Sequence, residues 1–146
     1  YGDWSSDVCS SDLSRKAREL ESSKNATLLF YWSETSKQIR IEGKVKRVSA
    51  KVSDEYFQSR PRESQVGAYA SSQSSVAASR QEIDDRFEYF KKKFEGKKIP
   101  RPDNWGGYVV MPSVIEFWQG RMSRLHDRIV YKKTSSGKWK KFRLFP

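Results

Sequence analysis

The stretch EFWQGRMSRLHDR, residues 116–128, holds the single histidine of the chain, His126, between two arginines. Side chains alternate between the two faces of a β-strand, so Arg124, His126 and Arg128 would point to one side of a strand here. Two guanidinium groups and one titratable ring on one surface would suit an anionic ligand that also needs a polar group near its reactive part. The same pattern also fits a solvated basic strand edge.

The charge of the chain favours an anionic partner. Its 146 residues include 29 lysines and arginines against 18 aspartates and glutamates, a formal net charge of +11. Such an excess suits nucleic acid, membrane headgroups or a small phosphorylated ligand. The length predicts one domain with a sizeable core, and an aromatic content of 14% argues against a disordered chain.

Cysteine and apolar content restrict the class of protein further. Cys9 is the single cysteine, so no internal disulfide can form, and one cysteine with one histidine argues against a zinc site. The longest apolar run, residues 26–32, is too short to span a bilayer, and the first residues do not resemble a secretory signal. We therefore expect a soluble cytoplasmic protein with no membrane partner and no bound metal.

Residues 1–13 differ in composition from the rest of the chain. The first twelve, YGDWSSDVCSSD, are rich in serine and aspartate, contain no lysine or arginine and show no helical or strand period. They are either a flexible terminus or a segment foreign to the natural protein, and the repeated SSD favours the second interpretation. We predict a non-family segment over 1–13 and a single domain over 14–146.

Capping residues and prolines predict four helices. Ser14 and Ser53 are placed to cap the first two, Pro61 suits the first turn of the third, and Ser79 with Glu82 forms a capping box for the fourth. In the fourth helix an apolar face for core packing recurs at spacings of four, three and four residues, namely Ile83, Phe87, Phe90 and Phe94. The predicted helices cover residues 14–23, 54–60, 61–70 and a stretch after 79 that ends by Gly96.

Apolar runs and alternating patterns predict five or six strands. Residues 26–32 are typical of a buried strand, and residues 37–48 alternate as a half-exposed strand does, with a turn at 33–36 between them. Three or four further strands are expected from the segments 106–111, 114–120, 127–133 and 138–145. Antiparallel strands with short helices between them predict an α+β, barrel-like domain.

Eight motifs occur in the same order and at similar spacings in one known family: SRKARELESS, LLFYW, YFQSRPRESQVGA, SSQSS, WGGY, EFWQG, RLHDR and RLFP. Over residues 14–146 the chain resembles the pyridoxamine 5'-phosphate oxidases. The resemblance implies an α+β fold, the FMN-binding split β-barrel, with mainly antiparallel strands and short flanking helices, incomplete here at its N-terminal side. It also implies a homodimer with FMN at the subunit interface.

The activity that the resemblance implies is the FMN-dependent oxidation of pyridoxamine or pyridoxine 5'-phosphate to pyridoxal 5'-phosphate, with O2 as acceptor and H2O2 as product. Matched by motif position, the FMN contacts would be Arg15, Lys16, Gln38, Gln73, Ser74, Trp118 and Arg128. The substrate contacts would be Tyr56, Arg60, Ser64, Arg124, Leu125 and His126, and we expect Arg124 and His126 to cover the substrate ring as the catalytic residues.

The residues themselves support a phosphate site. Tyr56 and Arg60 lie four apart on one helix, so they share a face, and Ser64 lies in the first turn of the next helix. An arginine, a phenol, a hydroxyl and a helix N-terminus would then converge on one anion. A surface helix pair with an ordinary cap is the alternative.

The sequence leaves two other functions open. A basic nucleic-acid-binding module would explain the net charge, but the aromatic residues follow core patterns and do not interleave with exposed cations. An FMN- or pyridoxal-phosphate-binding relative without turnover is the other rival. Neither rival is preferred, and no nucleic acid is expected as a partner.

Overall fold

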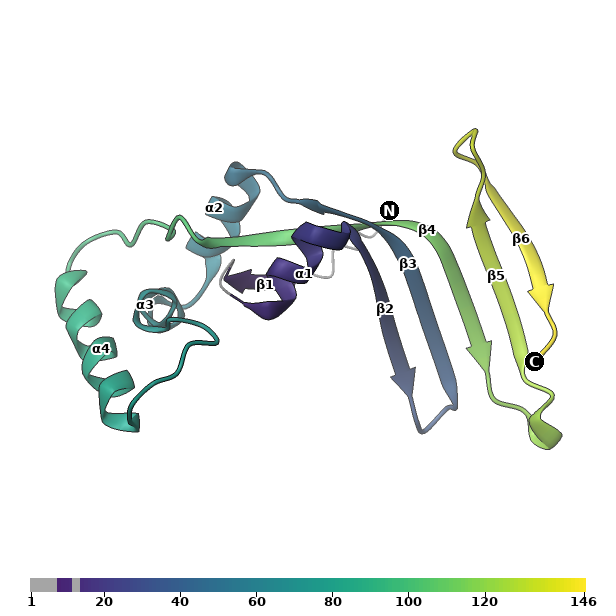
Figure 1. Cartoon of the computed structure of the whole chain (residues 1–146), viewed down its shortest axis with the longest axis horizontal. Helices are drawn as coiled ribbons and strands as arrows, with labels where there is room; N and C mark the ends of the chain where they lie inside the picture. Colours follow the sequence, from purple (N-terminus) through teal and green to yellow (C-terminus); the bar gives the residue numbers. More distant parts are fainter. Residues whose placement is uncertain (1–7, 12–13) are drawn as a thin grey trace. The chain divides into compact units, whose positions relative to one another are not determined.

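The computed structural model describes residues 8–11 and 14–146, which divide into two compact units (Figure 1). Of these residues, the helical unit comprises 8–11, 14–22 and 47–109, and the sheet unit comprises 23–46 and 110–146. In chain order the elements are β1 (Val8–Ser11), α1 (Arg15–Ser23), β2 (Asn25–Trp32), β3 (Lys37–Arg47), α2 (Ala50–Ser59), α3 (Arg62–Ala70), α4 (Arg80–Lys93), β4 (Trp105–Gln119), the 3-10 helix η1 (Met122–Arg124), β5 (Asp127–Lys133) and β6 (Trp139–Leu144).

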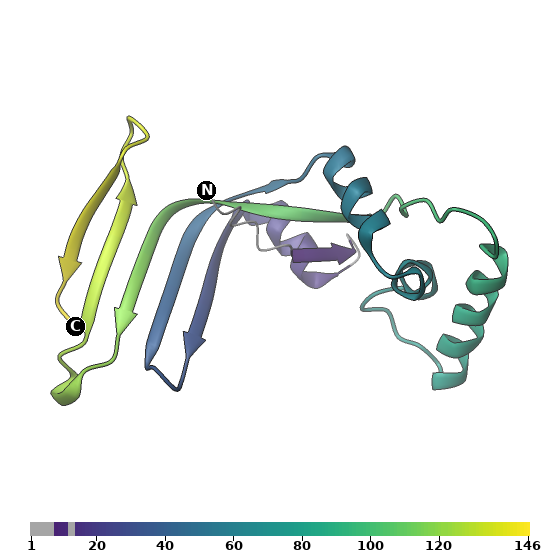
Figure 2. The ribbon, with the colours of Figure 1, turned by 180° about the vertical axis from the view of Figure 1, so that it is seen from behind.

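The strands of the sheet unit lie side by side in the order β2-β3-β4-β5-β6, as both views of the ribbon show (Figures 1 and 2). The registered pairs are antiparallel. Trp32 faces Lys37 across the β2–β3 turn, Trp118 faces Arg128 between β4 and β5, and Tyr131 faces Lys141 between β5 and β6. The predicted strands and the turn at 33–36 are therefore confirmed in outline.

Strand β4 joins two of the predicted segments. Residues 106–111 and 114–120 belong to one strand, which runs without interruption from Trp105 to Gln119, so three strands close the chain. Gly43 on β3 explains how the chain passes Pro112. A Cβ atom at position 43 would lie 2.2 Å from the carbonyl oxygen of Met111, so only glycine lets the two backbones approach this closely beside the proline.

Strand β2 was predicted to be buried, and this prediction is wrong. The exposed fractions are 60% for Leu29, 59% for Tyr31 and 45% for Trp32. β2 is the outermost strand of the sheet order, so its side chains have a strand neighbour on one side only. The apolar run therefore correctly predicted a strand but not its burial.

A small aromatic core holds the helical unit together. Phe57 from α2, Val66 from α3 and Trp105 at the start of β4 pack with Phe94 and Ile99. The predicted apolar face of α4 contributes through Phe87, Phe90 and Phe94, whereas Ile83 is 43% exposed and lies outside the core. Ile99 lies between α4 and β4, where its full burial anchors a segment without regular structure.

Two of the three predicted N-cap serines are confirmed, and one is wrong. Ser14 Oγ accepts a hydrogen bond from the Ala17 amide at 3.1 Å, and Ser79 Oγ accepts one from the Glu82 amide at 3.1 Å, as predicted. The cap of α2 is Ser49, which accepts from the Val52 amide at 3.3 Å, and not Ser53.

The earlier start of α2 also explains why Ser53 is buried. The serine lies four residues before Phe57, so both side chains turn to the same buried face of the helix. The helix ends before Pro61 as expected, and this proline is the N-cap of α3, one position earlier than its predicted place in the first turn.

Strand β1 lies in the segment for which no regular structure was predicted. It pairs antiparallel with the first residues of β4, with Val8 opposite Tyr108 and Ser11 opposite Trp105. Backbone pairing needs no side-chain period, which is why the sequence pattern missed it. The other residues of the predicted non-family segment lie outside the described part, and its foreign origin stays a prediction.

Among the described residues no helix has the length and apolar content needed to cross a membrane. The longest, α4, has 14 residues and ends in three lysines.

The close passage at Gly43 generates a stability prediction. Replacing Gly43 with alanine forces a Cβ atom onto the backbone of β4, so the free energy of unfolding should fall by about 2 kcal/mol. Gly67→Ala is the matched control, because no atom beyond the backbone of its own helix lies within 4 Å of its added Cβ and alanine favours the helix by up to about 1 kcal/mol. Urea unfolding followed by circular dichroism measures both, and equal effects would contradict the packing argument.

Candidate functional site

A buried carboxylate joins three strands of the sheet unit. Glu116 on β4 is 4% exposed, and its Oε1 accepts a hydrogen bond from Arg128 Nε at 2.7 Å. Its Oε2 accepts one from Arg40 Nη2 at 2.9 Å. The hydrogen bond from Arg128, with that from Arg40, holds the pKa of Glu116 below its usual range despite the opposing effect of burial. The acid is therefore ionised and links β3, β4 and β5 through charge.

Predicted FMN contacts gather on the face of the sheet that carries this carboxylate. Gln38 lies two residues before Arg40, and Trp118 lies two residues after Glu116, so strand alternation places both on this face. Trp118 is also the register partner of Arg128. The structure thus brings together three residues that the resemblance assigned to FMN: Gln38, Trp118 and Arg128.

The predicted catalytic histidine lies beside this face. The ring of His126 is 4.8 Å from that of Trp118, tilted by 44°. Its Nδ1 accepts a hydrogen bond from the backbone amide of Arg121 at 3.1 Å. An amide that donates to Nδ1 needs a lone pair there, so Nε2 carries the hydrogen of the neutral ring.

The opening prediction that Arg124, His126 and Arg128 alternate along one strand is wrong. Arg124 ends the 3-10 helix η1, and strand β5 begins only at Asp127. Ser123 and Arg124 both have left-handed backbones, with φ values of 57° and 60°, so the chain turns sharply before the strand starts. Arg124 and Leu125 are exposed on this turn, and only Arg128 belongs to the strand.

An aspartate fixes the end of the turn. Asp127 Oδ2 accepts a hydrogen bond from Arg121 Nε at 2.9 Å, and Oδ1 accepts one from Arg143 on β6. These two guanidinium groups lower the pKa of Asp127. Because the Arg121 amide is the group that binds His126, the ion pair to Asp127 also holds the histidine in place.

The predicted substrate-phosphate residues lie in the helical unit. Tyr56 is on α2, Arg60 is the C-cap of that helix, and Ser64 is in the first turn of α3. Gln65, which is buried, donates from Nε2 to the carbonyl oxygen of Arg60 at 2.9 Å and so fixes the junction between the helices.

Trp105 supports two of these residues and was not predicted as part of a site. Its ring is stacked on Tyr56 at 6.0 Å and 16°, and the guanidinium carbon of Arg60 lies 5.2 Å from its centre. Trp105 is 7% exposed, so its aromatic surface is a fixed platform for both. The only sequence signal was its place in the WGGY motif, which equally fits a core residue.

Four other predicted FMN contacts belong to the helical unit. Arg15 and Lys16 open α1, where Arg15 is exposed and pairs with Glu19 at 2.7 Å. Gln73 and Ser74 lie in the exposed loop between α3 and α4, and Ser74 has a left-handed backbone with φ of 66°. The residues assigned to FMN are therefore divided between the two units, and their convergence stays a prediction.

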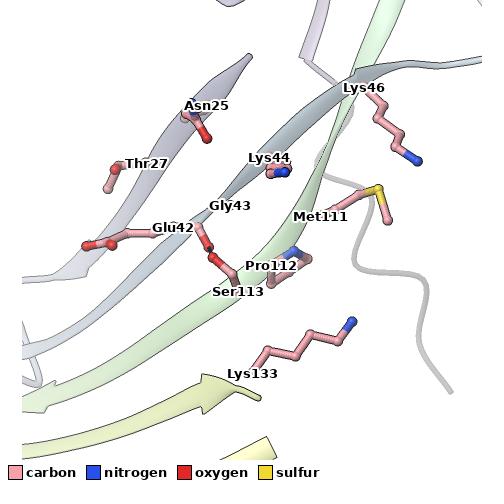
Figure 3. A pocket seen from close by; sticks show the side chains of 11 residues that line it. Asn25, Thr27, Glu42, Gly43, Lys44, Lys46, Met111, Pro112, Ser113 and Lys133 are labelled. Atoms are coloured by element: carbon pink, nitrogen blue, oxygen red, sulfur yellow. Dashed lines mark hydrogen bonds between the residues drawn. The ribbon is translucent and has the colours of Figure 1, made fainter. Parts of the chain in front are cut away.

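A groove of about 750 Å³ lies in the sheet unit, away from the predicted site residues (Figure 3). Lys44, Lys46 and Lys133 lie around it, together with Glu42 and Ser113, whose Oγ donates to the Glu42 carbonyl oxygen at 3.2 Å. None of the predicted site residues lines this groove, so its size alone does not make it the functional site.

Comparisons with known proteins agree with this fold and these motifs. Residues 8–94 match the family described as pyridoxamine 5'-phosphate oxidase, and residues 105–146 match the pyridoxine 5'-phosphate oxidase C-terminal dimerisation region. A pyridoxine/pyridoxamine 5'-phosphate oxidase of Leptospira interrogans is 53% identical over 133 residues, which are 91% of this chain and 62% of the relative. One from Rubrobacter xylanophilus is 51% identical over 132 residues, or 90% and 60% of the two chains.

Solved structures, among them the following two, also resemble the chain. PhzG from Burkholderia lata 383, in complex with tetrahydrophenazine-1-carboxylic acid, has a TM-score of 0.85 and 31% identity, covering 94% of this chain and 67% of that one. A pyridoxamine 5'-phosphate oxidase-related, FMN binding protein from Nostoc punctiforme has a TM-score of 0.69 at 14% identity, covering 94% and 70%, a likeness of fold alone.

The sheet and its flanking helices therefore define a split-barrel protein, and the predicted α+β fold class is confirmed. The chain belongs to the pyridoxamine 5'-phosphate oxidase family. It spans about three fifths of the length of the curated relatives that it matches.

The buried carboxylate generates a pH prediction. Because folding lowers the pKa of Glu116, its stabilisation is complete above the unfolded-state value of about 4.3 and is lost as pH falls through the lower folded value. Glu116→Gln should therefore reduce the free energy of unfolding at pH 7 by about 2 kcal/mol. The difference from the wild type should shrink steadily below about pH 4.3.

Urea unfolding at a series of pH values measures this difference. Glu55→Gln, at an exposed position on α2, is the control and should follow the wild type at every pH. A gap between wild type and Glu116→Gln that stays constant into the acid range would contradict ionisation of Glu116 as the source of the stability.

Proposed function

We propose that the chain catalyses the FMN-dependent oxidation of pyridoxamine or pyridoxine 5'-phosphate to pyridoxal 5'-phosphate, with O2 as acceptor and H2O2 as product. The observation that carries the proposal is the common sheet face of Gln38, Trp118 and Arg128 with His126 beside it. Relatives that bear this activity in their name are about half identical over nine tenths of the chain, which supports the same reaction here.

The chemistry of the donor set fits FMN. Arg128 offers guanidinium N–H groups, Gln38 an amide and Trp118 a flat aromatic surface, which suit the anionic and ring parts of a flavin nucleotide. In the helical unit, Arg15 and Lys16 add positive charge at the start of α1, where the partial positive charge of a helix N-terminus also favours an anion. These residues, with Gln73 and Ser74, would hold the cofactor.

The substrate phosphate is proposed to bind Tyr56, Arg60 and Ser64. Stacking on Trp105 holds Tyr56 and Arg60 on one surface, and Ser64 follows in the first turn of α3. A preset arginine, phenol and hydroxyl lower the entropy lost when a dianion binds. The fixed platform therefore supports selection of phosphorylated ligands.

The chemical step needs orientation more than acid–base work by the chain. FMN, when bound, would supply the acceptor for a hydride, which carries two electrons, from the carbon that bears the amine or alcohol. Arg124 and Leu125, exposed on the turn, and His126 would cover the substrate ring and keep it in register. With its Nδ1 occupied by the Arg121 amide, the neutral His126 donates a hydrogen bond from Nε2 to the substrate.

A homodimer is proposed as the working form. Residues 105–146 match a region described as a dimerisation region, and apolar side chains of β2 are exposed in the single chain. A second copy would cover such surface, which isolated soluble chains rarely leave open.

A second candidate substrate class is a dihydro- or tetrahydro-aromatic carboxylic acid, favoured by the likeness to the PhzG complex. That likeness is weaker in sequence, at 31% identity against 53%. A carboxylic acid would also leave part of the proposed phosphate site unpaired, so we place this candidate second.

Flavin spectroscopy tests the proposal. The purified chain loaded with FMN should lose its yellow absorbance when pyridoxamine 5'-phosphate is added without air, and oxygen should restore the colour with release of H2O2. Bound FMN that does not respond to either phosphorylated vitamin would contradict the proposed activity and favour a binding protein. Response only to a reduced phenazine acid would favour the second candidate, and a colourless protein that retains RNA would favour a nucleic-acid-binding module.

Substitutions on the turn test the proposed roles. Arg124→Ala and His126→Ala should each lower kcat/KM by about a hundredfold, because orientation of the substrate ring is lost, while the Kd for FMN stays within about twofold of the wild-type value. Met122→Ala is the control, since Met122 is 91% exposed on the same turn and should leave both quantities unchanged. Parallel loss of FMN binding and turnover would contradict these roles.

A further inference from the structure

Glu116 is a buried acid to which neither the motifs nor the proposed chemistry assign a role. We propose that it is a positioning residue, which orients the guanidinium of Arg128 toward the bound flavin nucleotide. The inference rests on the proposed function, in that it takes FMN as the ligand of this sheet face. It adds a residue that sets how tightly that ligand is held.

The geometry of Arg128 carries the argument. Its Nε donates to Glu116 at 2.7 Å, and its Nη1 donates to the carbonyl oxygen of Phe145 at 3.2 Å. Within the part of the chain that the structure describes, its Nη2 makes no hydrogen bond. Because a guanidinium is planar and its five N–H groups are fixed in one fork, holding Nε and Nη1 also sets the direction of Nη2. Arg128 thus presents its Nη2 group as a hydrogen-bond donor with a fixed direction.

Two carboxylates and two guanidinium groups meet around this arginine. The carboxylate of Glu116 is shared between Arg40 and Arg128, and Arg40 also pairs with Glu42 at 2.5 Å. The four charges cancel, so what Arg128 offers an anion is the Nη2 donor of its charged guanidinium, on the face where Gln38 and Trp118 lie.

A purely structural role for Glu116 predicts a different outcome. A strand clamp affects stability but not the affinity of the folded protein for FMN. Glutamine at position 116 keeps the shape of the side chain, but its amide nitrogen cannot accept from a guanidinium. One of the two arginines must then lose its partner, and the aim of Arg128 is lost if the clamp is what sets it.

The experiment measures the Kd for FMN by quenching of flavin fluorescence in the full chain, with circular dichroism to confirm folding. Glu116→Gln should weaken binding by about tenfold or more, the effect of losing a hydrogen bond to a charged group. Glu42→Gln is the matched control: it removes the same charge from the other partner of Arg40 without touching Arg128, and its Kd should stay within about twofold of the wild-type value.

A double substitution separates positioning from a general electrostatic effect. Lysine at position 128 keeps the charge but has no Nε–H fork for Glu116 to orient. Arg128→Lys should therefore weaken FMN binding, and adding Glu116→Gln to it should weaken binding no further. Independent, multiplying effects in the double variant would overturn the inference.

The remaining outcomes are distinguishable. Wild-type binding with equal Kd values for Glu116→Gln and Glu42→Gln would overturn the positioning role and leave the proposed function intact. Failure of the wild type to bind FMN would reject the proposed function and the inference with it. If Glu116→Gln does not fold, Glu116→Asp keeps the carboxylate but draws Arg128 back by one methylene, and an unchanged Kd in that variant would overturn the inference.

Discussion

The ionised carboxylate of Glu116, shared between Arg40 and Arg128, is the interaction on which the sheet unit depends. It replaces water with two guanidinium groups in a place where an unpaired charge would cost several kcal/mol, and it is 4% exposed. Because the partners come from β3 and β5, one acid in β4 holds three strands together. The face that results has fixed charges and a flat tryptophan, which a flexible surface could not offer.

In the helical unit, aromatic packing fixes the proposed binding residues in place, as the buried carboxylate does in the sheet unit. Trp105 belongs to the core with Phe57 and Ile99, yet its other surface carries Tyr56 and Arg60. One side chain therefore joins the stability of the unit to the arrangement of its proposed anion-binding group. In both units the residues that the resemblance assigns to a ligand are held by a buried neighbour to which it assigns no ligand.

Sequence patterns predicted the elements better than their environment. Caps at Ser14 and Ser79, the proline after α2 and the alternation of β3 are local signals, and they were right because local geometry decides them. The burial of β2 depends on what lies beside a strand, and the left-handed turn at Ser123 and Arg124 depends on backbone strain, so neither has a period in the sequence. Glu116 could be suspected only as an acid within an apolar run, and its two arginines lie 76 and 12 residues away along the chain.

The open edge of β2 has a consequence for the life of the chain after synthesis. An outer strand with exposed leucine, tyrosine and tryptophan side chains offers its backbone as a template to any extended segment that meets it. At high concentration, molecules whose β2 edge is uncovered would therefore pair edge to edge and aggregate. Molecules whose β2 is covered by a partner would not.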